Sequence, residues 1–354
     1  MKQIEYLTMN FGCDPEFFFA KKTLKGRVGR IIGAEKIIPK EGVQVGNNTG
    51  AIIVDGVQAE LNPKPSACRQ NHAKLIHHAL LRVSQLMKSN RRKRITINWK
   101  PTVRVTPSEL RSLSPEYRIL GCSPSLNAYD EHIEMPDPTT YPYRSAGGHI
   151  HIGFVYKDGK DPVRDLLKGD LKTVVKVLDI IVGNTCILID RDEGNIERRK
   201  AYGRAGEYRK PPHGLEYRVL SNFWLKDYKL MSFVFGLMRL GIGFANSKEA
   251  VTKLFKAVKE EDIRNAINNN DFGLAKANFE KIKPLIIEGA HPQHSLNNIR
   301  IPLFEKFIET GGVKRWFRKN PLKHWASGRV GGSDRGWERF LDEELTYESR
   351  KISK

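Results

Sequence analysis

Two histidines stand two residues apart in the segment GGHIHIG, residues 147–153. The alternation of polar and apolar residues predicts a β-strand, whose successive side chains point to opposite faces. His149 and His151 then share one face, and Ile150 and Ile152 share the other. Because imidazoles are costly to bury without a partner, this face predicts a bound metal ion or phosphate. The histidine pair alone suits a metal-dependent hydrolase equally well.

Three further segments carry two polar residues at alternate positions of a predicted strand. The pairs are Asp14 and Glu16, Glu60 and Asn62, and Glu216 and Arg218. Pro15 restricts the first segment to an edge strand or to the start of a strand, because proline donates no ladder hydrogen bond. Several carboxylates together with imidazole favour a hard divalent cation such as Mg²⁺ or Mn²⁺. We therefore expect an oxygen-rich metal site.

An arginine-rich stretch leads into the fourth segment. Its members are Arg191, Arg198, Arg199, Arg204, Arg209 and Arg218. Guanidinium groups match phosphate oxygens and stabilise the charge that develops during phosphoryl transfer. An exposed basic loop is the alternative interpretation. The sequence contains no GxxxxGK[ST] motif, so a bound ATP would be held by metals and arginines instead.

A mixture of strands and helices must position these segments. We expect β-structure up to about residue 65, a helix over 70–87, a strand over 95–105, a long loop over 124–143, helix over 163–189, a charged loop over 190–212, a strand over 215–220, and mostly helix from residue 227. The strands come singly between long connections. This order predicts an α+β fold rather than a regular βαβ series.

Composition limits the classes of protein to which this chain can belong. The 354 residues carry a formal net charge of +20, which favours polyanionic partners. The longest apolar run, 230–245, is too short to span a bilayer and contains Arg239, so it predicts a buried helix and no membrane partner. The N-terminus lacks the apolar core of a signal peptide. Four scattered cysteines show no metal-binding spacing. These features predict a cytoplasmic protein.

The order of the four segments resembles that of the carboxylate–amine ligases of the glutamine synthetase and glutamate–cysteine ligase superfamily. The phage-associated COOH–NH2 ligases are the branch to which it is most similar. Residues 14–16 (DPE) resemble the acid-x-Glu strand of these enzymes, although Glu is usual where Asp14 stands, and residues 60–63 (ELNP) resemble the element that follows. Residues 148–151 resemble the GxHxH strand, and residues 216–218 (EYR) resemble the ExR strand.

This resemblance implies a curved antiparallel sheet that forms an active-site funnel, flanked by helices. The glutamine synthetase-like catalytic domain would span residues 1–250, and residues 251–354 would form a basic helical extension. ATP would phosphorylate a substrate carboxylate, and an amine would displace the phosphate to give an amide. The carboxylate and the amine could belong to small molecules, peptides or proteins.

The resemblance also implies roles for individual residues, with ATP and Mg²⁺ or Mn²⁺ as cofactors. The implied metal ligands are Glu16, Glu60, His149 and Glu216. Arg218 would hold the transferred phosphoryl group, and together with Glu216 and Arg209 it forms the implied catalytic set. The residues that would neutralise the ATP phosphates are Arg199, Arg204 and Arg209. His151 would orient a ligand or contact the substrate. If the chain is phage-encoded, its compartment would be the cytoplasm of a host bacterium.

Besides the hydrolase, a nucleic-acid-binding protein is a second alternative to the ligase. Its support lies at residues 314–339, where four aromatic residues are interleaved with lysines and arginines. These aromatics are Trp316, Phe317, Trp325 and Trp337. Aromatic rings among cations can stack bases and neutralise phosphates. A helical cap that packs its tryptophans inward explains the same pattern. A ligase whose C-terminal region binds an anionic partner combines the two functions.

Overall fold

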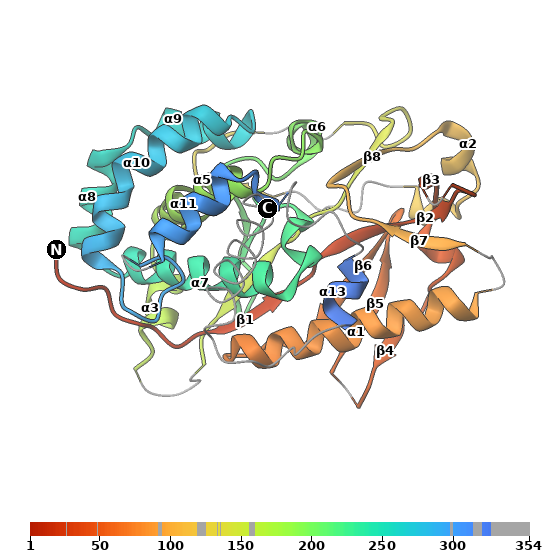
Figure 1. Cartoon of the computed structure of the whole chain (residues 1–354), viewed down its shortest axis with the longest axis horizontal. Coiled ribbons are helices and arrows are strands. Elements are labelled where there is room, and N and C mark those ends of the chain that lie inside the picture. The colour runs from red at the N-terminus through yellow and green to blue at the C-terminus, as the bar shows by residue number, and fades with distance from the viewer. Residues whose placement is uncertain are drawn as a thin grey trace, which may run out of the picture.

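A computed structural model describes most of the chain. The described residues are 1–25, 27–47, 49–90, 94–118, 125–132, 134, 136–155, 160–297, 300–313 and 321–326. They form helices and two larger antiparallel sheets, so the predicted α+β class is confirmed. In Figure 1, α8 (Lys248–Ala257), α9 (Glu260–Asn268) and α10 (Phe272–Gly289) lie at one end of the molecule, and the second sheet lies at the other.

The first sheet brings together strands that are far apart in the sequence. Its order is β1 (Asn10–Cys13), β11 (Ile150–Gly153), β13 (Gly214–Tyr217), β12 (Glu207–Arg209) and β9 (Leu126–Asn127), and all pairs are antiparallel. One row of directly opposed residues crosses four of these strands. The row contains Gly12, His151, Glu216 and Arg209. The curled antiparallel sheet therefore places histidine, acid and arginine side by side.

The second sheet continues from the first through two residues, Asp14 and Pro15. Its order is β3 (Val28–Ile32), β2 (Glu16–Lys22), β6 (Gln58–Pro63), β5 (Gly50–Asp55) and β4 (Val43–Val45), while β7 (Ile95–Asn98) also pairs with β2. Pro15 stands between β1 and β2, so the chain leaves one sheet and enters the other there. β2 begins directly after Pro15 and β1 is an edge strand, which confirms the prediction for this segment.

Two long helices pack as their apolar patterns predict. Helix α1 (Arg69–Ser89) extends the predicted helix by a residue or two at each end and buries one face, including Ile76, Leu80 and Val83. Helix α7 (Tyr228–Ala245) is long and apolar enough to cross a membrane, but 83% of it is buried inside the protein. It packs against α1 and α4 (Leu171–Leu178). The prediction of a buried core helix is therefore confirmed.

Three predicted elements are divided or wrong. The helix over 163–189 consists of α3 (Pro162–Lys168), α4, a π-helical turn (Asp179–Gly183) and α5 (Asn184–Ile189), because Gly169 ends α3 and Asp170 caps α4. The strand over 95–105 divides into β7 and β8 (Thr102–Arg104), which pairs with β10 (Tyr143–Ser145). The loop over 190–212 contains α6 (Gly194–Ala201) and β12. Each division occurs where the chain changes its packing partner.

One hydrophobic core joins the two predicted domains. It includes Phe244, Leu254 and Phe279, which lie on both sides of residue 250. The remaining elements are α2 (Pro107–Arg111), α11 (Ile301–Glu309), α13 (Pro321–Ala326) and short 3-10 helices at Ala34–Lys36, Pro115–Tyr117 and Asn222–Lys226. The boundary at residue 250 stays a prediction, and so does the basic character assigned to the C-terminal region.

The C-terminal aromatic residues can be placed at one position. Trp325 in α13 is buried, and its indole N–H donates a hydrogen bond to the carbonyl of Leu225 at 2.8 Å. This tryptophan therefore packs inward, as the helical-cap interpretation expects. The other aromatic residues of the predicted nucleic-acid-binding region, Trp316, Phe317 and Trp337, lie outside the described residues.

Candidate active site with two carboxylate groups

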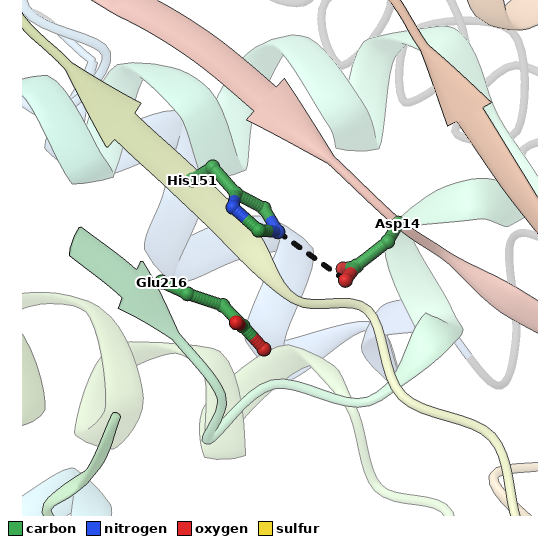
Figure 2. Close-up of side chains that lie close together, drawn as sticks. All are labelled: Asp14, His151 and Glu216. Atoms are coloured by element: carbon green, nitrogen blue, oxygen red, sulfur yellow. Dashed lines mark ion pairs between the residues drawn. The ribbon is translucent and has the colours of Figure 1, made fainter. Parts of the chain in front are cut away.

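Asp14, His151 and Glu216 form what we call the first carboxylate group. Each offers a ligand atom, and these atoms lie within 4.8 Å of one another. Figure 2 shows the three side chains converging from the end of β1, from β11 and from β13. His151 Nε2 lies 3.2 Å from Asp14 Oδ2. The direct pairing of β11 with β13 holds His151 opposite Glu216.

His149 reaches the same group from the residue before β11. Its Nδ1 lies 3.4 Å from Asp14 Oδ1 and 3.6 Å from Glu216 Oε1. The two histidines therefore share a face, as their spacing predicts. Burial alone would raise the pKa of Asp14, but the two imidazoles outweigh burial and hold that pKa well below its usual range. Asp14 thus keeps its negative charge.

Glu16, Asp55 and Glu60 form the second carboxylate group, whose ligand atoms also lie within 4.8 Å of one another. Glu16 and Glu60 face each other across β2 and β6. Glu16 Oε2 accepts hydrogen bonds from the Gly147 N–H at 2.5 Å and from the Tyr202 hydroxyl at 2.9 Å. These two donors hold the Glu16 carboxylate in place, close to those of Asp55 and Glu60.

Like charges dominate the second group. Burial and the neighbouring Glu16 raise the pKa of Asp55 to about 8. Burial, Asp14 and Glu16 raise the pKa of Glu60 to about 10. The charge of Asp14 acts on both side chains, so the two groups adjoin. Carboxylates pressed together in this way hold protons unless a cation neutralises them.

The donor atoms fit divalent cations. Carboxylate oxygens with imidazole nitrogen are a suitable ligand set for Mg²⁺ or Mn²⁺. Asp14 Oδ1 and His149 Nε2 are buried and make no hydrogen bond. Buried polar atoms without hydrogen bonds are unfavourable, and a bound cation would satisfy an oxygen of this kind. The residues at this junction of the sheets are therefore suited to hold metal ions.

Two of the predicted arginines reach the first group. Arg218 is almost fully buried, with its Nε 3.1 Å from Glu216 Oε1. Its Nη1 donates to the Ser125 hydroxyl at 2.6 Å. Arg209, from the neighbouring strand β12, places Nη1 3.4 Å from the same Glu216 oxygen. Positive charge therefore flanks the carboxylates on the β12 side.

The other predicted phosphate-binding arginines make different contacts. Arg199 is buried and donates from Nη1 to Asn270 Oδ1 at 3.1 Å. Burial and the neighbouring Arg198 lower its pKa to about 9. Arg204 Nη2 lies 3.4 Å from Glu131 Oε2. These contacts join Arg199 and Arg204 to residues outside both carboxylate groups.

Arg198 and Arg191, the other members of the arginine-rich stretch, support the fold. Arg198 is fully buried and donates to the backbone carbonyl groups of residues 218, 219 and 220, which follow β13. Arg191 lies over the ring of Phe272 and donates to the carbonyl of Ile308 at 2.6 Å. Guanidinium groups that satisfy backbone carbonyls in this way stabilise the chain itself.

Sequence reasoning missed Asp55 and Asp179. Asp55 precedes Gly56 and reads as a turn residue, although its position at the end of β5 places it beside Glu60. Asp179 is fully buried in the π-helical turn and accepts from the Tyr217 hydroxyl at 2.7 Å and from the Gly206 N–H at 2.6 Å. Burial raises the pKa of Asp179 to about 7. The π-helical turn would have indicated Asp179, but the helical periodicity of the sequence does not reveal such a turn.

Residues 137–309 match the profile of a family described as phage phiEco32-like COOH-NH2 ligase, type 2. This segment belongs to that family. The ligase segment contains both histidines, the arginine-rich stretch and Glu216, whereas Asp14 and the second carboxylate group precede it. The family name indicates an enzyme that joins a carboxylate to an amine. A comparison with curated proteins finds no match.

Proposed function

We propose that this protein is an ATP-dependent carboxylate–amine ligase that forms an amide or peptide bond through an acyl phosphate. The observation that carries the proposal is the adjacency of two carboxylate groups, one of them flanked by Arg209 and Arg218. The membership of residues 137–309 in a COOH–NH2 ligase family supports the same reaction. A glutamine synthetase-like catalytic funnel is part of this proposal.

The two carboxylate groups would each hold a divalent cation. Glu216 would be a ligand in the first group, with His149, His151 and Asp14 beside it, and Glu16 and Glu60 would be ligands in the second, with Asp55. Mg²⁺ or Mn²⁺ bound there would screen the phosphate charges of ATP. The Gly147 N–H and the Tyr202 hydroxyl would keep Glu16 oriented toward its cation.

Arg218 would bind the phosphoryl group that is transferred, and Arg209 would bind the adjoining phosphates. Both guanidinium groups are already oriented by Glu216, so little reorganisation is needed when charge develops in the transition state. Burial of Arg218 removes competing water from this position. Arg199 and Arg204 would contribute to phosphate binding only if their present contacts opened.

The proposed reaction has two displacements. A carboxylate oxygen of the first substrate attacks the γ-phosphorus of ATP, and ADP leaves. The nitrogen of the amine then attacks the acyl carbon, the C–O bond to phosphate breaks, and the nitrogen loses a proton. The products are an amide, ADP and inorganic phosphate. The cytoplasm is the expected compartment, because ATP is available there.

ADP release in the presence of Mg²⁺ tests this proposal. We expect release that requires both a carboxylate and a primary amine from a mixed panel, with the amide detected by mass spectrometry. ATP with Mg²⁺ should also raise the unfolding temperature, because ligands that bind only the folded state stabilise it. If ATP gives no stabilisation while a bond is cleaved without nucleotide, the hydrolase is the correct function. Salt-sensitive binding of duplex nucleic acid would support a ligase that also binds an anionic partner.

A further inference from the structure

A cavity of about 500 Å³ adjoins the first carboxylate group. Gly12 of β1, Pro63 at the end of β6, and Phe154 and Val155 directly after β11 line it. His151 lines the same cavity and is also a member of the first group. A ligand in this cavity would therefore touch the candidate metal centre itself.

The lining of the cavity carries no formal charge beyond its histidines. Among the described residues that line it, none is Lys, Arg, Asp or Glu. Pro63, Pro65, Phe154 and Val155 supply apolar walls. Away from His151 and His213, a phosphate or a second carboxylate of a ligand would have no counter-ion among these residues, and its burial would carry a large desolvation cost. The cavity is therefore suited to an uncharged, mostly apolar group.

The row of opposed residues across the first sheet gives the site a direction. It runs from Gly12 at the cavity, through His151 and Glu216, to Arg209. A Cβ atom at Gly12 would lie 3.3 Å from the Cβ of His151, so the glycine keeps the cavity end of the row open. The triphosphate of ATP belongs at the opposite, cationic end. The base of a nucleotide is separated from its reacting phosphate by the ribose and two phosphates, so it does not fit a cavity that borders the reaction centre.

The first group would favour the acid over the amine. A cation held by Asp14, His151 and Glu216 would attract a carboxylate and repel an ammonium group. The group that enters the adjoining cavity is then the one attached directly to the carboxylate. We infer that this cavity binds the uncharged carbon skeleton of the carboxylate substrate, an inference that rests on the proposed ligase function. Its volume lies within the range usual for small-molecule sites and admits an aliphatic or aromatic acid.

Calorimetric titration of the whole protein with Mg²⁺ and without ATP tests the inference. The probes are acetate, butyrate, hexanoate and phenylacetate, with adipate as a six-carbon control that carries a second charge. We expect affinity to rise about threefold to fourfold for each methylene that becomes buried. Adipate should bind no better than acetate. Equal affinity for acetate and hexanoate, or a preference for adipate, would overturn the inference.

Two substitutions at one position locate the binding. Val155→Trp fills the cavity, so hexanoate should bind this variant no better than acetate does, while acetate binding is unchanged. Val155→Ala enlarges the cavity and should keep a clear preference for hexanoate. An undiminished hexanoate affinity in folded Val155→Trp, checked by circular dichroism, would show that the chain binds elsewhere. The titration contains no ATP, so it tests the pocket independently of the ligase reaction. Chain-length preference in the titration without ADP release in the activity assay would refute the ligase function alone. ADP release without chain-length preference would refute the pocket alone.

Discussion

The two carboxylate groups lie side by side yet solve the problem of buried negative charge in opposite ways. In the first group, Arg209 and Arg218 flank Glu216, and His149 and His151 hold the pKa of Asp14 well below its usual range. In the second group, Asp55 and Glu60 meet Glu16 with no cationic side chain in the group, and their pKa values rise to about 8 and about 10. The protein therefore supplies part of the counter-charge at the first group and none within the second, so a bound cation matters more for the charge of the second group.

This difference suggests a division of labour. A group with built-in cations can bind and release a reacting anion, because its own charge is already balanced. A group of carboxylates alone depends on a divalent cation to become fully ionised. We expect the first group to carry the chemistry and the second to be the more tightly coupled to metal binding.

The largest expected effect follows from loss of Glu216, the acid that contacts both arginines. Glu216→Gln removes the charge that orients Arg209 and Arg218, so ADP release should fall about a thousandfold or more. The matched control is Glu116→Gln, whose exposed carboxylate pairs with Lys40 outside both groups and should leave the rate unchanged. Full activity of Glu216→Gln would remove the first group from the mechanism.

Opposite effects on metal-free stability should separate the two groups. The folded-state pKa of Glu60 is raised, so the stability contributed by its proton is present below about pH 4 and is lost as the pH rises toward 10. Glu60→Gln should therefore raise the free energy of unfolding in EDTA at pH 9 by about 2 kcal/mol. The folded-state pKa of Asp14 is lowered, so its charge stabilises the protein above the unfolded pKa, and Asp14→Asn should destabilise it at pH 7.

Denaturant titrations from pH 5 to pH 9, with and without Mg²⁺, measure these changes. Added Mg²⁺ should remove the advantage of Glu60→Gln, because only the wild type gains a fully charged ligand. Destabilisation by both substitutions in EDTA would contradict the comparison. The two variants would then share one electrostatic environment.

A smaller effect should follow from removing a hydrogen bond that supports β13, the strand that carries Glu216. Tyr217 lies between Glu216 and Arg218 in the sequence, and its hydroxyl donates to the buried Asp179. Tyr217→Phe should lower the free energy of unfolding by about 1 kcal/mol. We expect kcat to fall about tenfold while the Mg²⁺ dependence of stability, which reports mainly on the second group, is retained. Tyr208→Phe, opposite Tyr217 on β12, is the control and should change neither quantity appreciably.

The smallest effect is expected at Arg204, to which the family resemblance gives a role in binding the ATP phosphates. Its contact with Glu131 is partly exposed, and such pairs contribute about 1 kcal/mol or less. Arg204→Ala should therefore change the KM for ATP by less than about threefold, whereas Arg209→Ala should raise it about tenfold or more. Initial rates at varied ATP decide between these arginines. A large effect at Arg204 would show that its contact with Glu131 opens when ATP binds.

Local patterns in the sequence predicted the strands that carry the site. The alternation around His149 and His151, the position of Pro15 and the helical spacing in α1 all depend on neighbouring residues, and the structure confirms each of them. The order of these segments was also sufficient to indicate the ligase family that residues 137–309 match.

Contacts between distant strands could not be predicted in this way. Asp55 joins Glu60 only because β5 pairs with β6, and Arg209 reaches Glu216 only because β12, which the sequence presents as charged loop, pairs with β13. Arg198 and Arg199 have the same side chain as Arg209, but helix α6 turns both into the interior. Residue type alone therefore does not distinguish an arginine that supports the fold from one that contacts the site.

The passage of the chain from one sheet to the other through Pro15 has a consequence for the two cations that we propose. Asp14 and Glu16 are separated by one residue, so their Cα atoms stay within about 7 Å of each other in any arrangement of the sheets. Covalent bonds, rather than packing, would thus limit the distance between the two proposed cations. Loops elsewhere can lengthen without altering that spacing, but one residue inserted between Asp14 and Glu16 would reset it.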